Sequence, residues 1–184
     1  RQFFDEVSGG EALLPLIVLV GLNFSNQLDL TAFGILAPDI RDAFHLSNGG
    51  FLTLVALTTL GALLLPVPLA YYSDRLPRVA LALIGAVIWA VFGLFTGLAF
   101  TLAFLIIARS GAGMGRAVIT PTHNSLLSDF HPPEVRADVF GAHQIGLAFG
   151  AFVGGALGGM LGQVFGWRVP FILFAVPTFV FVFL

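Results

Sequence analysis

The sequence predicts an all-α membrane protein built as a bundle of six transmembrane helices. Of its 184 residues, 58% are hydrophobic and 10% are charged, whereas soluble domains carry about 25% charged residues. The apolar residues form six segments separated by short polar turns, and the first five exceed the roughly 20 residues that span a bilayer core. Two arginines, Arg109 and Arg116, lie inside one of these segments.

We expect an N-terminal interfacial segment over residues 1–11 and a transmembrane helix bundle over residues 12–184. The helices are predicted at about 12–37, 49–72, 79–100, 102–127, 139–162 and 169–184. Pro66 and Pro68 should bend the second helix and Pro121 the fourth, because proline removes a backbone hydrogen bond. Since the sequence starts without Met and stops inside an apolar run, we interpret it as a fragment of a longer chain.

Composition excludes several classes of function. There is no cysteine, which excludes a disulfide framework and a thiolate metal site, and no spacing of histidines suggests a metal or other cofactor. All eight basic residues are arginines in a chain of net charge −2, so no basic patch exists to bind nucleic acid. An intramembrane serine protease would need its serine and histidine at one depth. Ser110 and His143 are predicted near opposite membrane faces, so we do not expect an enzyme.

Orientation follows from the arginines in the loops, because cytoplasmic loops of membrane proteins carry the excess of basic residues. Four arginines fall on the N-terminal side of the membrane and two on the other. The first set is Arg1, Arg75, Arg78 and Arg136, and the second is Arg41 and Arg168. The count predicts a cytoplasmic N-terminus, and we expect the protein to lie in the plasma (inner) membrane.

Polar side chains concentrate in the first and fourth helices. They are Asn23, Asn26, Gln27 and Asp29 in the first, and Arg109, Arg116, Thr120 and His123 in the fourth. The residues of the fourth helix follow one another at spacings of seven, four and three, which places them in one stripe. Because a charge at the bilayer centre costs at least ~2.5–3.5 kcal/mol, this stripe should face a protein interior or a watery cavity.

Helix rise gives the depth of each charge. Asp29 and Arg109 both lie about eight residues from the outer ends of their helices, or roughly 12 Å deep, so the sequence predicts that they pair. Arg116 lies deeper, level with Asn23, and no carboxylate is expected at its level. We therefore interpret Arg116 as a candidate for binding an anionic group. His143, which begins the fifth helix, is interpreted as a packing or loop-contact residue.

The fifth helix carries a glycine at every fourth position. The series is Gly146, Gly150, Gly154, Gly158 and Gly162. Ridges of small residues let two helix backbones approach closely inside a membrane, so this pattern by itself predicts tight helix packing.

Three motifs, taken in chain order, carry a resemblance to a known family. Between the second and third helices, Asp74, Arg75 and Arg78 match the pattern Gly-x-x-x-Asp-Arg-x-Gly-Arg-Lys, while Ala70, Pro77 and Val79 differ from it. In the fourth helix, an arginine is followed by a glycine-rich turn, here Arg109, Gly113 and Gly115. In the fifth, the glycines of an antiporter motif are Gly141, Gly150, Gly154, Gly155, Gly158 and Gly159, with Gly155 in place of a proline.

By these motifs the chain resembles the major facilitator superfamily, and the resemblance implies the first half of a twelve-helix secondary active transporter. It is similar in particular to the spinster-like lysolipid transporters, through Asn26-Gln27-Leu28-Asp29 and through Arg109 with Gly113-Met114-Gly115-Arg116-Ala117. Where that branch has a glutamate, this chain has Arg116. Asp29 is thus the one carboxylate predicted deep in the membrane, and we expect it to carry the coupling proton.

The resemblance also implies partners and a gate. The substrate is expected to be an amphipathic or lipid-like molecule, moved by alternating access through a cavity between this half and the missing one. The first, second, fourth and fifth helices should line that cavity. The cytoplasmic gate is expected to contain Asp74, Arg75, Arg78, Asp129 and Arg136. The alternatives are a multidrug efflux antiporter of the same fold and a membrane receptor or scaffold that does not transport.

Overall fold

The computed structural model describes residues 13–63 and 77–184, and the described part is helical without a strand. The helices are α2 (Leu13–Ile35), α3 (Ala37–Ala43), α4 (Asn48–Leu63), α6 (Arg78–Gly97), α7 (Leu102–Phe130), α8 (Arg136–Phe165) and α9 (Arg168–Phe183), with a 3₁₀ turn η1 (Pro133–Val135). Several predictions fall outside these ranges: the interfacial segment 1–11, the prolines Pro66 and Pro68, and the predicted gate residues Asp74 and Arg75. Thr120 lies within α7, but its side chain is not described.

Each described helix lies in one of the predicted apolar segments, with one addition. The first span ends at Ile35, and the chain then forms the short helix α3, most of which was expected to be a loop. A proline in the first turn of α3 favours this new start, because proline is tolerated where the backbone N–H has no helical partner. The axes of α3 and α4 differ by 106°.

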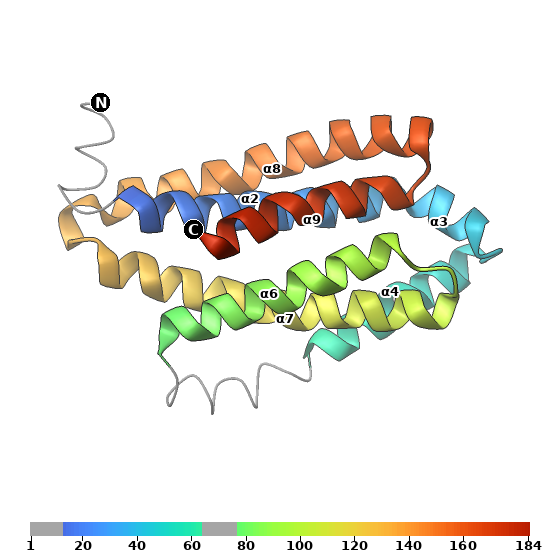
Figure 1. Cartoon of the computed structure of the whole chain (residues 1–184), viewed down its shortest axis with the longest axis horizontal. Helices are drawn as coiled ribbons and strands as arrows, with labels where there is room; N and C mark the ends of the chain where they lie inside the picture. The colour runs from blue at the N-terminus through green and yellow to red at the C-terminus, as the bar shows by residue number, and fades with distance from the viewer. Residues whose placement is uncertain (1–12, 64–76) are drawn as a thin grey trace.

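The order of packing follows an internal repeat of three helices (Figure 1). α2 packs on α8 and α9, α7 packs on α4 and α6, and α6 packs on α9. Exchanging the first three spans (α2, α4, α6) with the second three (α7, α8, α9) leaves this pattern of neighbours unchanged. Because α2 and α7 run in opposite directions across the bundle, the two units form an inverted repeat of the kind found in secondary transporters.

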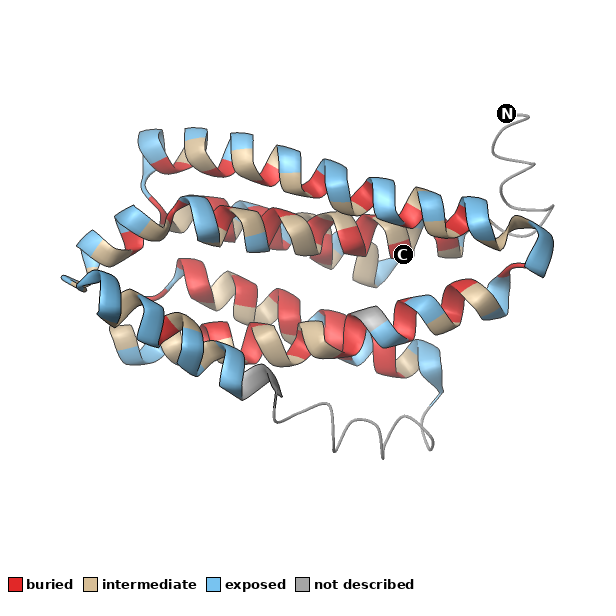
Figure 2. Cartoon of the chain, turned by 180° about the vertical axis from the view of Figure 1, so that it is seen from behind, coloured by how far each residue is buried: buried red, intermediate tan, exposed pale blue. Residues whose placement is uncertain are grey.

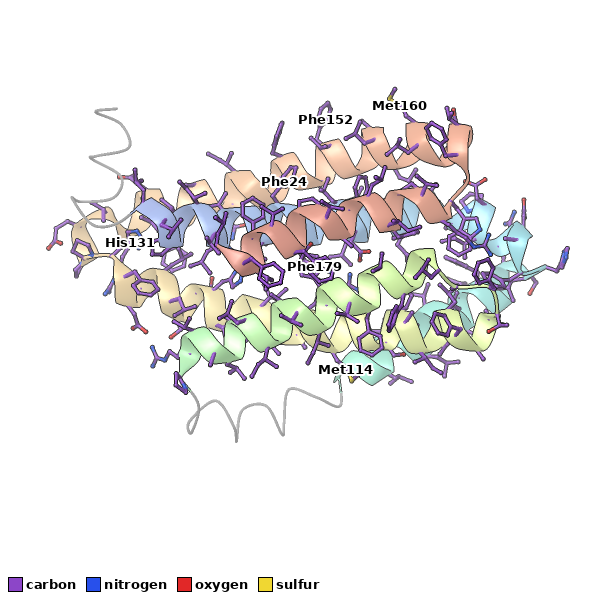
Figure 3. All side chains as sticks on the ribbon, in the orientation of Figure 1. Phe24, Met114, His131, Phe152, Met160 and Phe179 are labelled. Carbon is purple, nitrogen blue, oxygen red and sulfur yellow. The ribbon has the colours of Figure 1, made fainter. Side chains whose placement is uncertain are left out.

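The outer surface of the bundle is apolar. Four helices are long and apolar enough to cross a membrane, and the bent pair α3–α4 makes a fifth when it is taken as one span, among the described residues. Buried residues face inward between the helices (Figure 2), whereas Phe152 and Met160 project away from α8 (Figure 3) and are 73% and 65% exposed. Such a surface is compatible with lipid or with a second helical bundle, and not with water.

The glycine ridge of α8 lies directly against α2. A Cβ atom added at Gly150 would lie 2.4 Å from the carbonyl oxygen of Phe24, and one at Gly154 would lie 2.7 Å from the Cα of Leu28. Gly146 and Gly158 also lie against α2, at Val20 and Ala32, and Gly162 lies against the side chain of Leu36, just after α2. The ridge therefore brings the two backbones together as the spacing predicts.

Three predicted packing glycines behave differently. A Cβ at Gly155 would meet the side chains of Ile35 and Thr31, at 3.3 and 3.6 Å, and one at Gly159 would meet the side chain of Ile35 at 3.6 Å. One at Gly141 would meet no atom within 4 Å, so the interpretation of Gly141 as a packing glycine of this bundle is wrong. Gly141 precedes the ridge by five residues rather than four, which turns it away from α2. A second close approach, between Gly85 of α6 and Gly115 of α7, joins the other half of the repeat.

Candidate functional site

The most deeply buried charges form a charged triad of Asp29 from α2 with Arg109 and Arg116 from α7. The Nη1 atom of Arg109 donates to both carboxylate oxygens of Asp29, at 3.1 Å to Oδ1 and 2.9 Å to Oδ2. The Nη1 atom of Arg116 donates to the same Oδ2. The side chains of Asp29 and Arg109 are 6% and 4% exposed, and that of Arg116 is 14% exposed. The pair predicted from helix depth, Asp29 with Arg109, is present.

The prediction that Arg116 meets no carboxylate is wrong. Its Cα lies two turns below that of Arg109 on the same face of α7, but side chains on a helix lean toward its N-terminus. The long guanidinium arm of Arg116 therefore reaches back along α7 to the level of Asp29. Depth estimated from Cα positions alone misses this reach.

The triad carries a net positive charge, because one carboxylate cannot neutralise two guanidinium groups. Within the described ranges, no other acidic side chain forms an ion pair with either arginine. Arg109 is enclosed by aromatic rings, with its Cζ 4.0 Å from the ring centre of Phe33 and 5.7 Å from that of Phe171. These cation–π contacts favour a cation that is removed from water. Arg116 is the more accessible of the two.

Space remains beside the carboxylate on the side of α6 and α9. A small cavity of about 10 Å³ is lined by Asp29 together with Trp89, Gly93, Phe174 and Thr178. This volume is close to that needed for one water molecule, and Asp29 and Thr178 supply polar atoms at its wall. The triad is thus closed to larger molecules on this side.

Four other predicted polar residues, three in α2 and one in α7, form no hydrogen bond with the triad among the described residues. The amide nitrogen of Asn23 donates to the backbone carbonyl of His143 at 2.9 Å, and Nδ1 of His123 lies 3.3 Å from Nε2 of His143. Asn26 is half-buried, and its Oδ1 has no hydrogen-bond partner among the described residues. Gln27 is half-buried beside Gly150.

His143 is the residue of this region that sequence reasoning missed. It precedes Gly146 by three positions, so it continues the glycine ridge that faces α2. This spacing could have predicted the contact from the sequence. A polar residue in line with the glycine ridge must face α2, and Asn23 is the polar residue of α2 at that level. The contacts of His143 with Asn23 and with His123 together join α2, α7 and α8.

Two of the predicted gate residues that the structure describes form an ion pair between helices. Nη1 of Arg78, at the start of α6, donates to Oδ2 of Asp129, near the end of α7, at 2.5 Å, and both side chains are about half exposed, at 56% and 51%. Arg136 does not join Asp129, contrary to the predicted network. It donates instead to the carbonyl oxygens of His131 and Ser128, at 3.1 and 2.8 Å, because carbonyls at a helix end lack helical partners.

The ion pair of Arg78 and Asp129 is expected to add little stability, since exposed pairs contribute about 0.2–1 kcal/mol. We predict a coupling free energy in that range from a double-mutant cycle of Arg78→Ala and Asp129→Asn, measured by thermal unfolding of the full-length protein in detergent. A coupling free energy above about 2 kcal/mol would contradict this interpretation and indicate a desolvated pair.

Comparisons with known proteins agree with this architecture. The sequence model described as Major Facilitator Superfamily matches residues 19–184. The chain is 30% identical over 161 residues to a hexuronate transporter of Bacillus subtilis (strain 168), covering 87% of this chain and 38% of that protein. It is 31% identical over 167 residues to a lincomycin resistance protein of Streptomyces lincolnensis, covering 87% of this chain and 33% of that protein.

The fold is also similar to a solved structure. A bacterial homolog of the human lysosomal transporter Spinster, in an inward-facing and unoccupied conformation, superposes with a TM-score of 0.75 at 25% identity. The match covers 92% of this chain and 41% of that one, so the chain spans well under half the length of its relatives. The matching family model, the apolar helices and the inverted repeat together identify an integral membrane protein. The chain belongs to the Major Facilitator Superfamily.

Proposed function

We propose that this chain is the N-terminal half of a secondary active transporter that carries an amphipathic organic anion, with the net positive charge of the triad as its recognition element. The observation that carries the proposal is the excess guanidinium group of the triad. A buried charge without a partner is expensive, and an anionic group of the substrate would neutralise it. Charge-assisted hydrogen bonds from arginine to carboxylate or phosphate are among the strongest in proteins.

Arg116 is the residue proposed to meet the substrate. Arg109 is closed in between Phe33 and Phe171, whereas the side chain of Arg116 keeps 14% of its surface exposed. Only one N–H group of Arg116 is used by Asp29, which leaves further donors of the guanidinium fork for a ligand. The relative from Bacillus subtilis is named a hexuronate transporter, and a hexuronate is an organic acid.

Asp29 is proposed to carry the coupling proton. Protonation would abolish its charge and weaken both of its ion pairs with α7, which would release Arg109 and Arg116 toward the substrate. The anion would then offset the charge that the proton adds, so that proton and substrate favour each other at one site. Rocking of this half against a C-terminal half, around a site near the middle of the membrane, would complete alternating access. The topology that we propose has a cytoplasmic N-terminus in the plasma (inner) membrane.

The proposal is tested by flux into proteoliposomes that contain the full-length protein, with a hexuronate, a lysophospholipid and lincomycin as separate substrates. Arg116→Ala is expected to raise the half-saturating concentration of the anionic substrate by about 10–150-fold, the loss of one or more charged hydrogen bonds worth about 1.5–3 kcal/mol. Arg116→Lys should recover part of the affinity, because lysine keeps the charge but not the fork.

Arg41→Ala is the matched control. Arg41 lies in the short helix α3 at the outer end and bonds to Asp42 and Asn48, so its loss should leave affinity unchanged. Unchanged affinity in Arg116→Ala would rule out the recognition role. Transport of lincomycin alone, insensitive to Arg116, would favour a drug antiporter, in line with the relative named for lincomycin resistance. Binding without flux of any of the three would favour a receptor or scaffold.

A further inference from the structure

A second buried polar group lies apart from the triad. We call it the histidine cluster: Asn23 of α2, His123 of α7 and His143 of α8. Its three residues are 4%, 0% and 6% exposed. Asn23 precedes Asp29 by six residues and His123 follows Arg116 by seven, so the cluster lies about 9–10 Å from the triad toward the N-terminal end of α2. The proposed transport mechanism assigns it no role.

The hydrogen bonds of the cluster determine where its protons are. The carbonyl oxygen of His143 can only accept, so the group of Asn23 that lies 2.9 Å from it is the NH₂ group. The same nitrogen lies 3.4 Å from Nδ1 of His143, and we assign Nδ1 as the acceptor of its second N–H, so that this atom carries no proton. His143 then holds its proton on Nε2 and donates to Nδ1 of His123 at 3.3 Å.

It follows that both imidazoles are neutral in this arrangement. His123 carries its proton on Nε2, and this atom is buried without a hydrogen-bond partner among the described residues. One basic position remains, the lone pair of Nδ1 on His143, which accepts only the long contact from Asn23. The three groups form a directional chain from Asn23 through His143 to His123.

We propose that His123 and His143 form a second proton-binding site of the transporter, which takes up one proton at Nδ1 of His143 and releases the side chain of Asn23 as it does so. An N–H group on Nδ1 would face the NH₂ group of Asn23, and two donors cannot bond to each other. The amide cannot simply turn over, because its oxygen would then face the carbonyl oxygen of His143. Proton binding therefore breaks a contact between α2 and α8.

The site holds one proton and not two. The ring centres are 5.5 Å apart, and two cations at that separation in an apolar bundle repel strongly. The triad lies further along α2 and α7. The other ionisable residues of α7 and α8 are Asp129, Arg136 and Asp138, near the ends of these helices, and the single ionisable residues of α6 and α9, Arg78 and Arg168, also lie at helix ends. The described part of α4 has no ionisable residue.

The inference deepens the proposed proton coupling and rests on it, but proton binding can be measured without transport. We expect nitrogen-15 NMR of the full-length protein, labelled in histidine, to show two buried imidazoles protonated at Nε2 at high pH. On acidification, one imidazolium should form for the two rings. His143→Gln should abolish it. His131→Gln is the control, because His131, at the C-terminal end of α7, is also buried but its ring makes a polar contact only with the carbonyl oxygen of Leu127 among the described residues.

Asn23→Asp tests the site without removing a histidine. A carboxylate beside Nδ1 would stabilise the imidazolium, so this variant should hold its proton to a pH about 1–3 units higher than the wild type. Two rings that stay neutral until the protein unfolds, or that titrate separately like exposed histidines, would overturn the proposal.

Transport supplies the last readout. In proteoliposomes, His143→Gln should take up one proton fewer per transport cycle while substrate exchange at equal pH on both sides is retained. An unchanged proton count in that variant would overturn the role of the site in coupling. Absence of substrate exchange in the wild type would instead defeat the proposed function and leave the NMR result standing.

Discussion

Replacing Asp29 by asparagine is expected to destabilise the bundle by about 3–5 kcal/mol, the cost of removing one partner from a buried ion pair. The carboxylate is the one acidic group bonded to Arg109 and Arg116 in the described part of the chain. Without it, two guanidinium groups would remain close together in an apolar interior. The change is measured as the loss of thermal stability of the full-length protein in detergent.

Two further variants make this result specific. Asp39→Asn removes an exposed carboxylate in α3 and should change the free energy of unfolding by less than about 0.5 kcal/mol. Combining Asp29→Asn with Arg116→Gln restores the net charge of the triad and should recover part of the stability. Equal stability of Asp29→Asn and wild type would show that the triad is not desolvated in the membrane. Gradient-driven transport by Asp29→Asn, if the variant folds, would rule out the proton-carrier role.

The second large effect is expected at Gly154, where α8 crosses α2. A Cβ added there would lie 2.7 Å from the Cα and 2.8 Å from the carbonyl oxygen of Leu28. Because these are backbone atoms, the helices must separate, and overpacking of this kind costs about 1–3 kcal/mol for small additions. Gly154→Ala should fall in that range. Gly154→Leu should prevent native packing and, through Leu28, displace the adjacent Asp29 from the arginines.

Gly159→Ala is the matched control, because it adds the same methyl group on the same helix one turn further along. Its Cβ would lie 3.6 Å from a side-chain atom of Ile35, an ordinary contact distance. Thermal unfolding and the yield of monodisperse protein should separate the two substitutions. If Gly154→Ala were as stable as Gly159→Ala, the close approach of α2 and α8 would be refuted.

Part of the candidate site was predictable because charge and helix geometry act locally. The depth of Asp29 and Arg109 follows from residue counts along two helices, and the polar stripe of α7 follows from the spacing of its members. The partners of Arg116 and His143 were not predicted, for two different reasons. Arg116 reaches its partner through a long side chain, and His143 meets Asn23 only because the glycine ridge turns that face of α8 toward α2.

The sequence by itself determined that this is a membrane protein of apolar helices and where its spans lie. It also determined which helix faces carry polar side chains and which carry small residues. These properties depend on composition and on periods of a few residues. The tertiary structure alone decided that both arginines share one carboxylate and that α3 breaks from α4 by 106°. The physical reason is that periodicity orients each helix about its own axis, while only packing decides which neighbour each face meets and how far a flexible side chain reaches.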